Sequence, residues 1–469
     1  MNPISTLAVQ AADRFLARRE THPTRLDAAI DQALVRTGSL PDRATAKAWA
    51  AAKLTAALPV APLIGTAMFG SLPLDTAISR RRAQRLPGAL RSADPAIVGR
   101  HLHLDPGGRY LISSDLHRCI PGARDWPRLQ ETDELYRVTL EHYAKEDWGL
   151  IEAGDVEDLW MAGGTAMGAA IDALRLLGAV LWPIDRRVSH ATARVQLGRI
   201  VENHAATYRT IAERFAAPGR YWRLSGNHDD PLSRPEVAAA MRRRLPGFAV
   251  RDVISLGEPD RTPEAVITHG HLTDPWNGPR GAWRGRIVTS LATTIADLRG
   301  HELGITDGTA RRAFLSGRAG NRLRSIRGPF SMDRDQFTLN ETELHEAFAD
   351  RFGEDAGPWL VLGHTHVPGD GPWDPGTGSR YRRYVNCGSG VGQRLVTAVE
   401  WDGTAEARRP RLVAIARQSD LDESGPIDAA RPGPEGPAHR IALHGGRRET
   451  IGTLDGEPVV KVAFSAPPD

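Results

Sequence analysis

Five short blocks of the sequence place aspartate, asparagine or histidine directly after an apolar run. The blocks are Asp115-Leu-His117, Gly154-Asp155, Gly226-Asn-His-Asp229, His269-Gly270 and Gly363-His-Thr-His366. Carboxylate oxygen, imidazole nitrogen and amide oxygen atoms together form a ligand set for hard-to-borderline divalent metal ions. No nearby pair of cysteines suggests a structural zinc site. We therefore expect these blocks to bind divalent metals.

Each apolar run predicts a buried strand, because it is short and ends at polar or turn-forming residues. The predicted strands cover residues 109–114, 148–153, 221–225, 264–268 and 358–362. In layered α/β proteins, sites assemble on the loops at the carboxyl ends of the strands. Within Asp115/His117 and His364/His366, residues two apart on an extended backbone point the same way. The sequence thus predicts that the five blocks converge on one site.

Two divalent metals at such a site suit phosphoryl transfer. A single carboxylate, here Asp155, can bridge two ions, and ions about 3.5–4 Å apart can hold both the attacking and the leaving oxygen. A metal-bound water can reach a pKa of about 7 and so supply hydroxide near neutral pH.

In this order, the five blocks resemble the calcineurin-like metallophosphoesterase superfamily, over a region of about residues 108 to 417. The resemblance implies an α/β fold of four layers, an α/β/β/α sandwich. It implies that one metal is bound by Asp115, His117, Asp155 and His366. It implies that the other metal is bound by Asp155, Asn227, His269 and His364.

The same resemblance implies roles for two more residues. His228 would contact the phosphate and protonate the leaving oxygen, and Asp229 would hold that imidazole in position. The expected activity is metal-dependent hydrolysis of a phosphomonoester, phosphodiester or diphosphate by metal-bound hydroxide. The expected cofactors are two divalent ions, Mn, Fe or Zn. Such a protein would be a phosphatase or phosphodiesterase.

Two further segments narrow the substrate class. Gly154–Trp160 and His269–Asp274 resemble the branch that contains UDP-2,3-diacylglucosamine hydrolases, which cleave a diphosphate and carry a lid. That resemblance implies a phosphorylated small molecule or a lipid-linked diphosphate as substrate. The long N-terminal region and the C-terminal tail depart from this branch. A nuclease of the same superfamily is an alternative, but the net charge of +3 argues against nucleic acid.

Substrate contacts are expected in two insertions, at residues 160–220 and 272–357. The second insertion is rich in arginine, which can bind phosphate or diphosphate groups through forked hydrogen bonds. The candidate substrate arginines are Arg311, Arg312, Arg318 and Arg322. A solvated helix face is the alternative interpretation of this run. His271 is a further candidate, for substrate contact or metal ligation, with a supporting or surface role as the alternative.

Outside the five blocks, residues 1–107 predict a helical N-terminal extension, from the apolar spacing of Ala-rich stretches. Residues 418–438, rich in Pro, Gly and acidic residues, predict a linker. Residues 439–469 contain a hairpin signal at Asp455-Gly456 and predict a small β appendage. Within the extension, Leu54–Leu74 carries no charge but contains three prolines, which favours a buried helical hairpin or a surface-packing segment.

Composition places the protein among ordinary soluble proteins. Of 469 residues, 41% are hydrophobic and 25% are charged, which excludes a disordered or collagen-like chain. Two cysteines cannot form a disulfide framework, and the first residues lack the layout of a signal peptide. We therefore expect a cytoplasmic protein. Arg80, Arg81, Arg82 and Arg85 follow the uncharged segment, so peripheral contact with an anionic membrane is a second possibility.

A different class of function is a non-catalytic scaffold that uses the phosphoesterase fold to bind a protein or membrane partner. The sequence argues against it, since none of the expected ligand positions is missing. The oligomeric state has no signal in the sequence.

Overall fold

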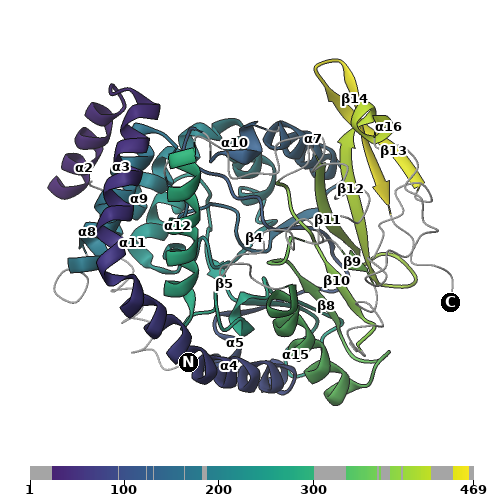
Figure 1. The fold of residues 1–469 in the computed structure, drawn as a ribbon. Coiled ribbons are helices and arrows are strands. Elements are labelled where there is room, and N and C mark those ends of the chain that lie inside the picture. The colour runs from purple at the N-terminus through teal and green to yellow at the C-terminus, as the bar shows by residue number, and fades with distance from the viewer. Residues whose placement is uncertain are drawn as a thin grey trace, which may run out of the picture.

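A computed structural model describes residues 24–463 apart from 93, 123, 130, 163, 182–186, 300–333, 367–368, 371–380, 392–394 and 424–446. The described part is a mixed α/β structure with two mixed β-sheets and helices around them (Figure 1). The predicted α/β class is therefore confirmed.

The larger sheet has eight strands. In pairing order they are β13 (Arg447–Leu454), β14 (Glu457–Ala463), β12 (Pro410–Arg417), β11 (Leu395–Asp402), β2 (Arg109–Ser113), β3 (Gly149–Glu152), β4 (Tyr221–Leu224) and β5 (Val250–Arg251). The four strands from β2 to β5 pair in parallel, and the others pair antiparallel. Three predicted site-bearing strands, β2, β3 and β4, are thus parallel neighbours.

The smaller sheet has six strands. In pairing order they are β1 (His101–Leu104), β6 (Val253–Leu256), β7 (Ala265–Ile267), β8 (Trp359–Leu362), β10 (Tyr384–Asn386) and β9 (Gly369–Asp370). The other two predicted site-bearing strands, β7 and β8, are parallel neighbours here.

Alternation along the strands explains why the two sheets pack together. On β2, Tyr110 and Ile112 join one apolar core while Leu111 joins another. The core on the Ile112 side also contains Ile267 of β7 and Val361 of β8, so it lies between the two sheets. Side chains one residue apart point to opposite faces of a sheet, so these strands bury both faces.

Helices cover the outer faces. Those that contribute to the core on the outer face of the larger sheet are α2 (Arg25–Thr37), α7 (Thr132–Lys145), α8 (Ala166–Leu181), α9 (Arg187–Asn203), α10 (Ala205–Ile211) and α11 (Pro235–Arg242). Those that pack on the outer face of the smaller sheet are α4 (Ala61–Ser92), α5 (Pro95–Val98) and α15 (Arg334–Phe352). In α7, Tyr136, Leu140 and Tyr143 are buried, at the three- and four-residue spacing of a one-sided apolar helix.

Three parts of the expected domain plan differ in the structure. The hairpin of β13 and β14 turns at Asp455-Gly456 as predicted, but β14 pairs with β12 and extends the larger sheet instead of forming an appendage (Figure 1). Val460 and Val462 reach the core between the sheets. Likewise, β1 lies within the expected helical extension but pairs with β6. The expected linker begins with a short helix, α16 (Gln418–Glu423).

The uncharged segment Leu54–Leu74 is not a buried hairpin. It runs from α3 (Asp42–Ala57) through the 3-10 turn η1 (Leu58–Val60) into α4, and most of its side chains are exposed. Pro59 and Pro62 stand in the first turns of the segments that follow α3, where proline is tolerated because its missing N–H would lack a partner in any case.

The sheet assignment of the C-terminal hairpin predicts a large stability effect. Val462→Asp would place an unpaired charge in the core between the sheets and lower the free energy of unfolding by at least about 3 kcal/mol. Thr453→Asp, on an exposed position of β13, would change it by less than about 0.5 kcal/mol. Urea unfolding, followed by tryptophan fluorescence, measures the free energy of unfolding of both variants. Equal losses of stability in the two variants would show that the hairpin does not share the core.

Candidate metal centre

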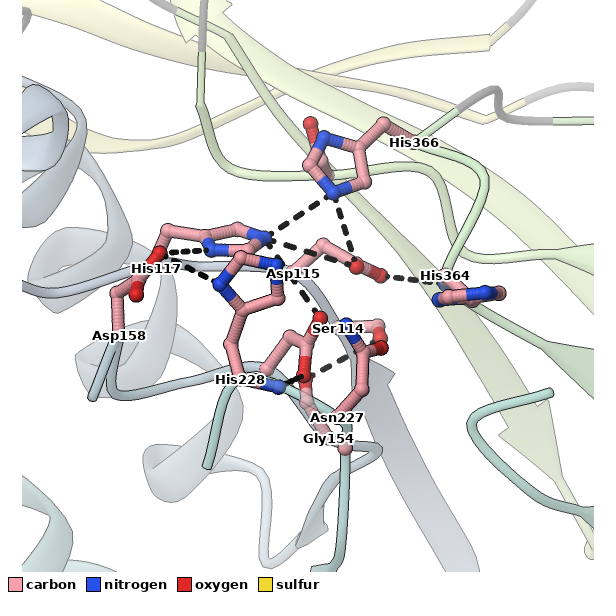
Figure 2. Close-up of polar contacts among 12 residues, drawn as sticks. Ser114, Asp115, His117, Gly154, Asp158, Asn227, His228, His364 and His366 are labelled. Atoms are coloured by element: carbon pink, nitrogen blue, oxygen red, sulfur yellow. Dashed lines mark hydrogen bonds and ion pairs between the residues drawn. The ribbon is translucent and has the colours of Figure 1, made fainter. Parts of the chain in front are cut away.

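The carboxyl ends of five strands from both sheets bring the predicted site residues together (Figure 2). Asp115, Asp155 and Asn227 follow β2, β3 and β4, while His269 and His364 follow β7 and β8. The site therefore lies where the ends of the two sheets meet. Three groups of titratable side chains form there, each with its ligand atoms within 4.8 Å of one another, and two of them consist of predicted metal ligands alone.

The first group consists of Asp115, His117 and His366. Nε2 of His366 lies 3.1 Å from Oδ1 of Asp115 and 3.1 Å from Nε2 of His117. Nε2 of His117 lies 3.9 Å from the same Asp115 oxygen. Two imidazole nitrogens and a carboxylate oxygen thus face one point.

The second group consists of Asp155, His269 and His364, with Asn227 beside them. Nε2 of His269 lies 3.3 Å from Oδ2 of Asp155 and 3.2 Å from Oδ1 of Asn227. Because Nε2 of His364 bonds to Asp274 at 2.8 Å, Nδ1 is the ring nitrogen that His364 has left to offer.

Asp155 is a member of the second group and also lies close to the first. Its Oδ2 lies 3.3 Å from His269 of the second group and 3.9 Å from His117 of the first. Its Oδ1 accepts a hydrogen bond from the backbone N–H of His228 at 2.8 Å. One buried carboxylate oxygen therefore stands between the two groups.

These residues fit divalent cations. Ligand atoms about 2.0–2.1 Å from one ion lie about 3–3.5 Å apart, and the closest contacts in both groups fall in that range. Oδ1 of Asp115 is buried and accepts no hydrogen bond of good geometry, a costly state that a cation would relieve. The His/Asp groups could therefore hold metal ions.

Without metal ions, protonated histidines balance the negative charge of the site carboxylates. Burial disfavours an imidazolium at His269, but the carboxylates of Asp155 and Asp115 outweigh it and raise the pKa to about 9. Burial likewise opposes charge on Asp155, but His269 and His228 hold its pKa well below its usual value. Metal ions compete with such protons for the same nitrogen atoms.

Several of the site residues have a left-handed backbone conformation, which sets the direction of their side chains. Among the described residues, nine other than glycine have positive φ, and five of them are Asp115, His117, Asp155, His364 and His366. Asp and His tolerate this region better than most residues, and such conformations cluster at functional sites. The extended backbone expected for the two Asp/His pairs is therefore wrong: tight turns at the strand ends, not strand alternation, direct these side chains.

Two glycines are required by close approach. A Cβ atom on Gly226 would lie 2.0 Å from Oδ1 of Asp155. A Cβ atom on Gly363 would lie 2.1 Å from Oγ of Ser114 and 2.7 Å from Oδ2 of Asp115. All three distances are far below van der Waals contact, so glycine lets the loops close around the carboxylates.

Asp158, not Asp229, holds His228. Oδ2 of Asp158 lies 2.9 Å from Nδ1 of His228 and 3.0 Å from Nδ1 of His117 (Figure 2). A carboxylate only accepts, so both rings carry their proton on Nδ1 and leave Nε2 for the site. Oδ1 of Asp158 accepts from the backbone N–H groups of Trp160 and Met161, which fixes the carboxylate.

Asp229 instead stabilises the loop that carries Asn227 and His228. Its carboxylate accepts from the backbone N–H of Gly226 at 2.6 Å and from Arg223 at 2.6 Å. Burial, with the charges of Asp155 and Glu157, raises its pKa to about 6 against the opposing charge of Arg223. The role expected for Asp229 fails because its carboxylate is bonded to Gly226 and Arg223, while Nδ1 of His228 bonds to Asp158.

Sequence reasoning missed an aromatic stack beside His228. The indole of Trp160 stacks on the His228 ring, with 4.5 Å between centroids. Trp160 also donates to Asp230 at 3.0 Å, and Asp230 pairs with Arg286 of α12 (Ala282–Arg299). Because the Trp160 indole is fixed by its hydrogen bond to Asp230 and stacks on His228, it restricts the rotation of the His228 ring. The signal available in the sequence was Trp160 itself, at the end of the Gly154–Trp160 block.

The remaining candidates divide into two sets. His271 is buried rather than at the surface, with its ring 5.2 Å from that of His269. Burial and the neighbouring His269 lower its pKa well below the usual value, so it stays neutral. The four candidate arginines, Arg311, Arg312, Arg318 and Arg322, lie outside the described residues. Arg286 is an arginine of the same insertion that lies beside the site.

Comparison of the chain with protein-family models and with curated proteins finds no match.

Metal binding should stabilise the protein. Because the ligands come from five loops, an ion that binds only the folded state raises the Tm by several degrees at saturating Mn²⁺, and EDTA reverses the shift. Asp155→Asn removes the shared carboxylate charge and should abolish most of the shift. Differential scanning fluorimetry measures it, with His142→Gln on α7 as a histidine control. An equal shift in wild type and Asp155→Asn would contradict the site.

The role of Asp158 gives a second prediction. Asp158→Asn exchanges an acceptor for a group that can donate, so His117 no longer presents a fixed Nε2, and Mn²⁺ affinity should fall about 10- to 100-fold. Isothermal titration calorimetry provides the measurement. Asp230→Asn, which changes a carboxylate bonded to Trp160 but not to His117, should keep the wild-type affinity. A loss in both variants, or in neither, would refute this assignment.

Proposed function

We propose that the protein is a metal-dependent phosphoric ester hydrolase related to the calcineurin-like metallophosphoesterases. The observation that carries the proposal is the position of Asp155 between two His/Asp groups, with His228 next to them. A shared carboxylate between two sets of N and O ligands is the arrangement that two-metal phosphoryl transfer needs. Asp115, His117 and His366 would hold one ion, and His269, His364 and Asn227 the other.

The side chains of the protein would perform the proton transfer. When bound, two divalent ions would polarise the phosphoryl group and lower the pKa of a water. His228 would bind the phosphate and donate a proton from Nε2 to the leaving oxygen, and Asp158 would stabilise the imidazolium through Nδ1. The His228 side chain is 18% exposed, so a substrate can reach it from solvent.

The fold is consistent with this relationship. Three separate apolar cores lie outside the larger sheet, between the sheets and outside the smaller sheet. They support an arrangement of helices, sheet, sheet and helices, as in the four-layer sandwich of the superfamily.

The substrate proposed is a phosphomonoester, phosphodiester or diphosphate of a small molecule or lipid-linked group, in the cytoplasm. The scaffold alternative lacks support because none of the expected ligand positions is missing from the sequence. The net charge of +3 argues against the nuclease alternative.

Hydrolysis of p-nitrophenyl phosphate and bis-p-nitrophenyl phosphate with Mn²⁺ tests the proposal. His228→Ala should lower kcat about 10²- to 10⁴-fold, because the leaving oxygen loses its acid. Asp155→Asn should remove turnover, and His142→Gln should keep it. Circular dichroism checks that each variant is folded. Unchanged turnover in His228→Ala or Asp155→Asn would contradict the proposal.

A further inference from the structure

The helical run from Leu54 to Leu74 presents an apolar surface of which most side chains are exposed in the described structure. The stretch Asp42–Leu90 is long and apolar enough to cross a membrane by length and composition, and 6% of its most apolar window is buried. Leu63 is 72% exposed, Leu58 65% and Phe69 57%. A helix that is apolar around its circumference normally lies in a protein core or in lipid, and exposed apolar patches of this kind mark interaction sites.

Both ends of this run are tied to the same side of the molecule. Before it, Lys53 pairs with Asp172 of α8 at 2.5 Å. After it, Asp75 pairs with Arg284 of α12 at 2.8 Å. α8 and α12 both pack on α3. A segment anchored at both ends to one face of a globular body can lie on a bilayer but cannot cross it.

The charges that flank the run favour an anionic partner. From Lys53 to Arg85 the chain has five basic residues and one acidic residue, Asp75, which is buried. Arg81 and Arg85 are exposed and follow the run within three turns. Basic residues beside an apolar interfacial helix attract the anionic headgroups of a membrane.

We propose that the helical elbow of residues 54–85 binds the surface of an anionic lipid bilayer, with Leu58, Leu63 and Phe69 inserted at the headgroup level and Arg81 and Arg85 on the headgroups. α3 and α4 lie along the outer edge of the molecule (Figure 1), and most side chains of residues 54–74 are exposed there. Phe69 also packs edge-on against Trp276, 6.1 Å between centroids, in the segment that leads from His271 to α12. Membrane contact would therefore take place near the metal centre. This inference does not rest on the proposed activity.

Vesicle sedimentation of the full-length protein tests it. The protein should sediment at low salt with vesicles of phosphatidylcholine and phosphatidylglycerol, and far less with phosphatidylcholine alone. The double variant Leu63→Glu, Phe69→Glu should remove binding. Arg81→Gln with Arg85→Gln should weaken vesicle binding about thirty-fold. Each basic residue near an anionic surface contributes about 1 kcal/mol of binding free energy, and the loss of two corresponds to about that factor. Leu129→Glu, an exposed leucine on α6 (Trp126–Leu129), is the matched control and should bind as wild type.

Three results would overturn the proposal. One is no sedimentation with anionic vesicles at low salt. Another is binding that Leu63→Glu, Phe69→Glu leaves intact. The third is a dimer in sedimentation velocity that the same double variant dissociates while vesicle binding is absent, since a second copy would then cover the elbow.

Discussion

The buried carboxylate of Asp155 is the constraint on which the site depends. An ionised carboxylate away from water is stable only with cationic or hydrogen-bonding partners. Asp155 finds them in three loops: the backbone N–H of His228 after β4, His269 after β7 and His117 after β2. The contacts that stabilise the Asp155 carboxylate therefore bring together strand ends from both sheets. They also place potential metal ligands on either side of this carboxylate.

A second layer of buried charges supports the first. Arg223 on β4 is buried among Glu152, Glu157 and Asp229, at distances of 3.1 Å to Glu152 and 2.6 Å to Asp229. Asp229 in turn bonds the backbone of Gly226, so the network ends at the loop that carries Asn227 and His228. Breaking such a buried pair leaves an uncompensated charge, which costs several kcal/mol. The loop is held in position by electrostatics beneath it rather than by apolar packing alone.

Local patterns in the sequence predicted much of this structure. The strands before Asp115, Asp155 and Asn227 were predictable because short apolar runs end at turn-forming residues, and their convergence followed from the layered architecture. The bond between Asp158 and His228 was not predictable, because it joins loops from different strands and Asp229 is the nearer carboxylate in sequence. The pairing of β14 with β12 was missed for the same reason: a hairpin signal says nothing about which edge the hairpin extends.

Anomalous diffraction from crystals of the protein soaked in Mn²⁺ would test whether Asp155 lies between two metal ions. We predict two peaks about 3.5–4 Å apart with Asp155 between them, one next to Asp115 and His366 and the other next to His269 and His364. A single peak, peaks away from Asp155, or no peak at saturating Mn²⁺ would contradict it.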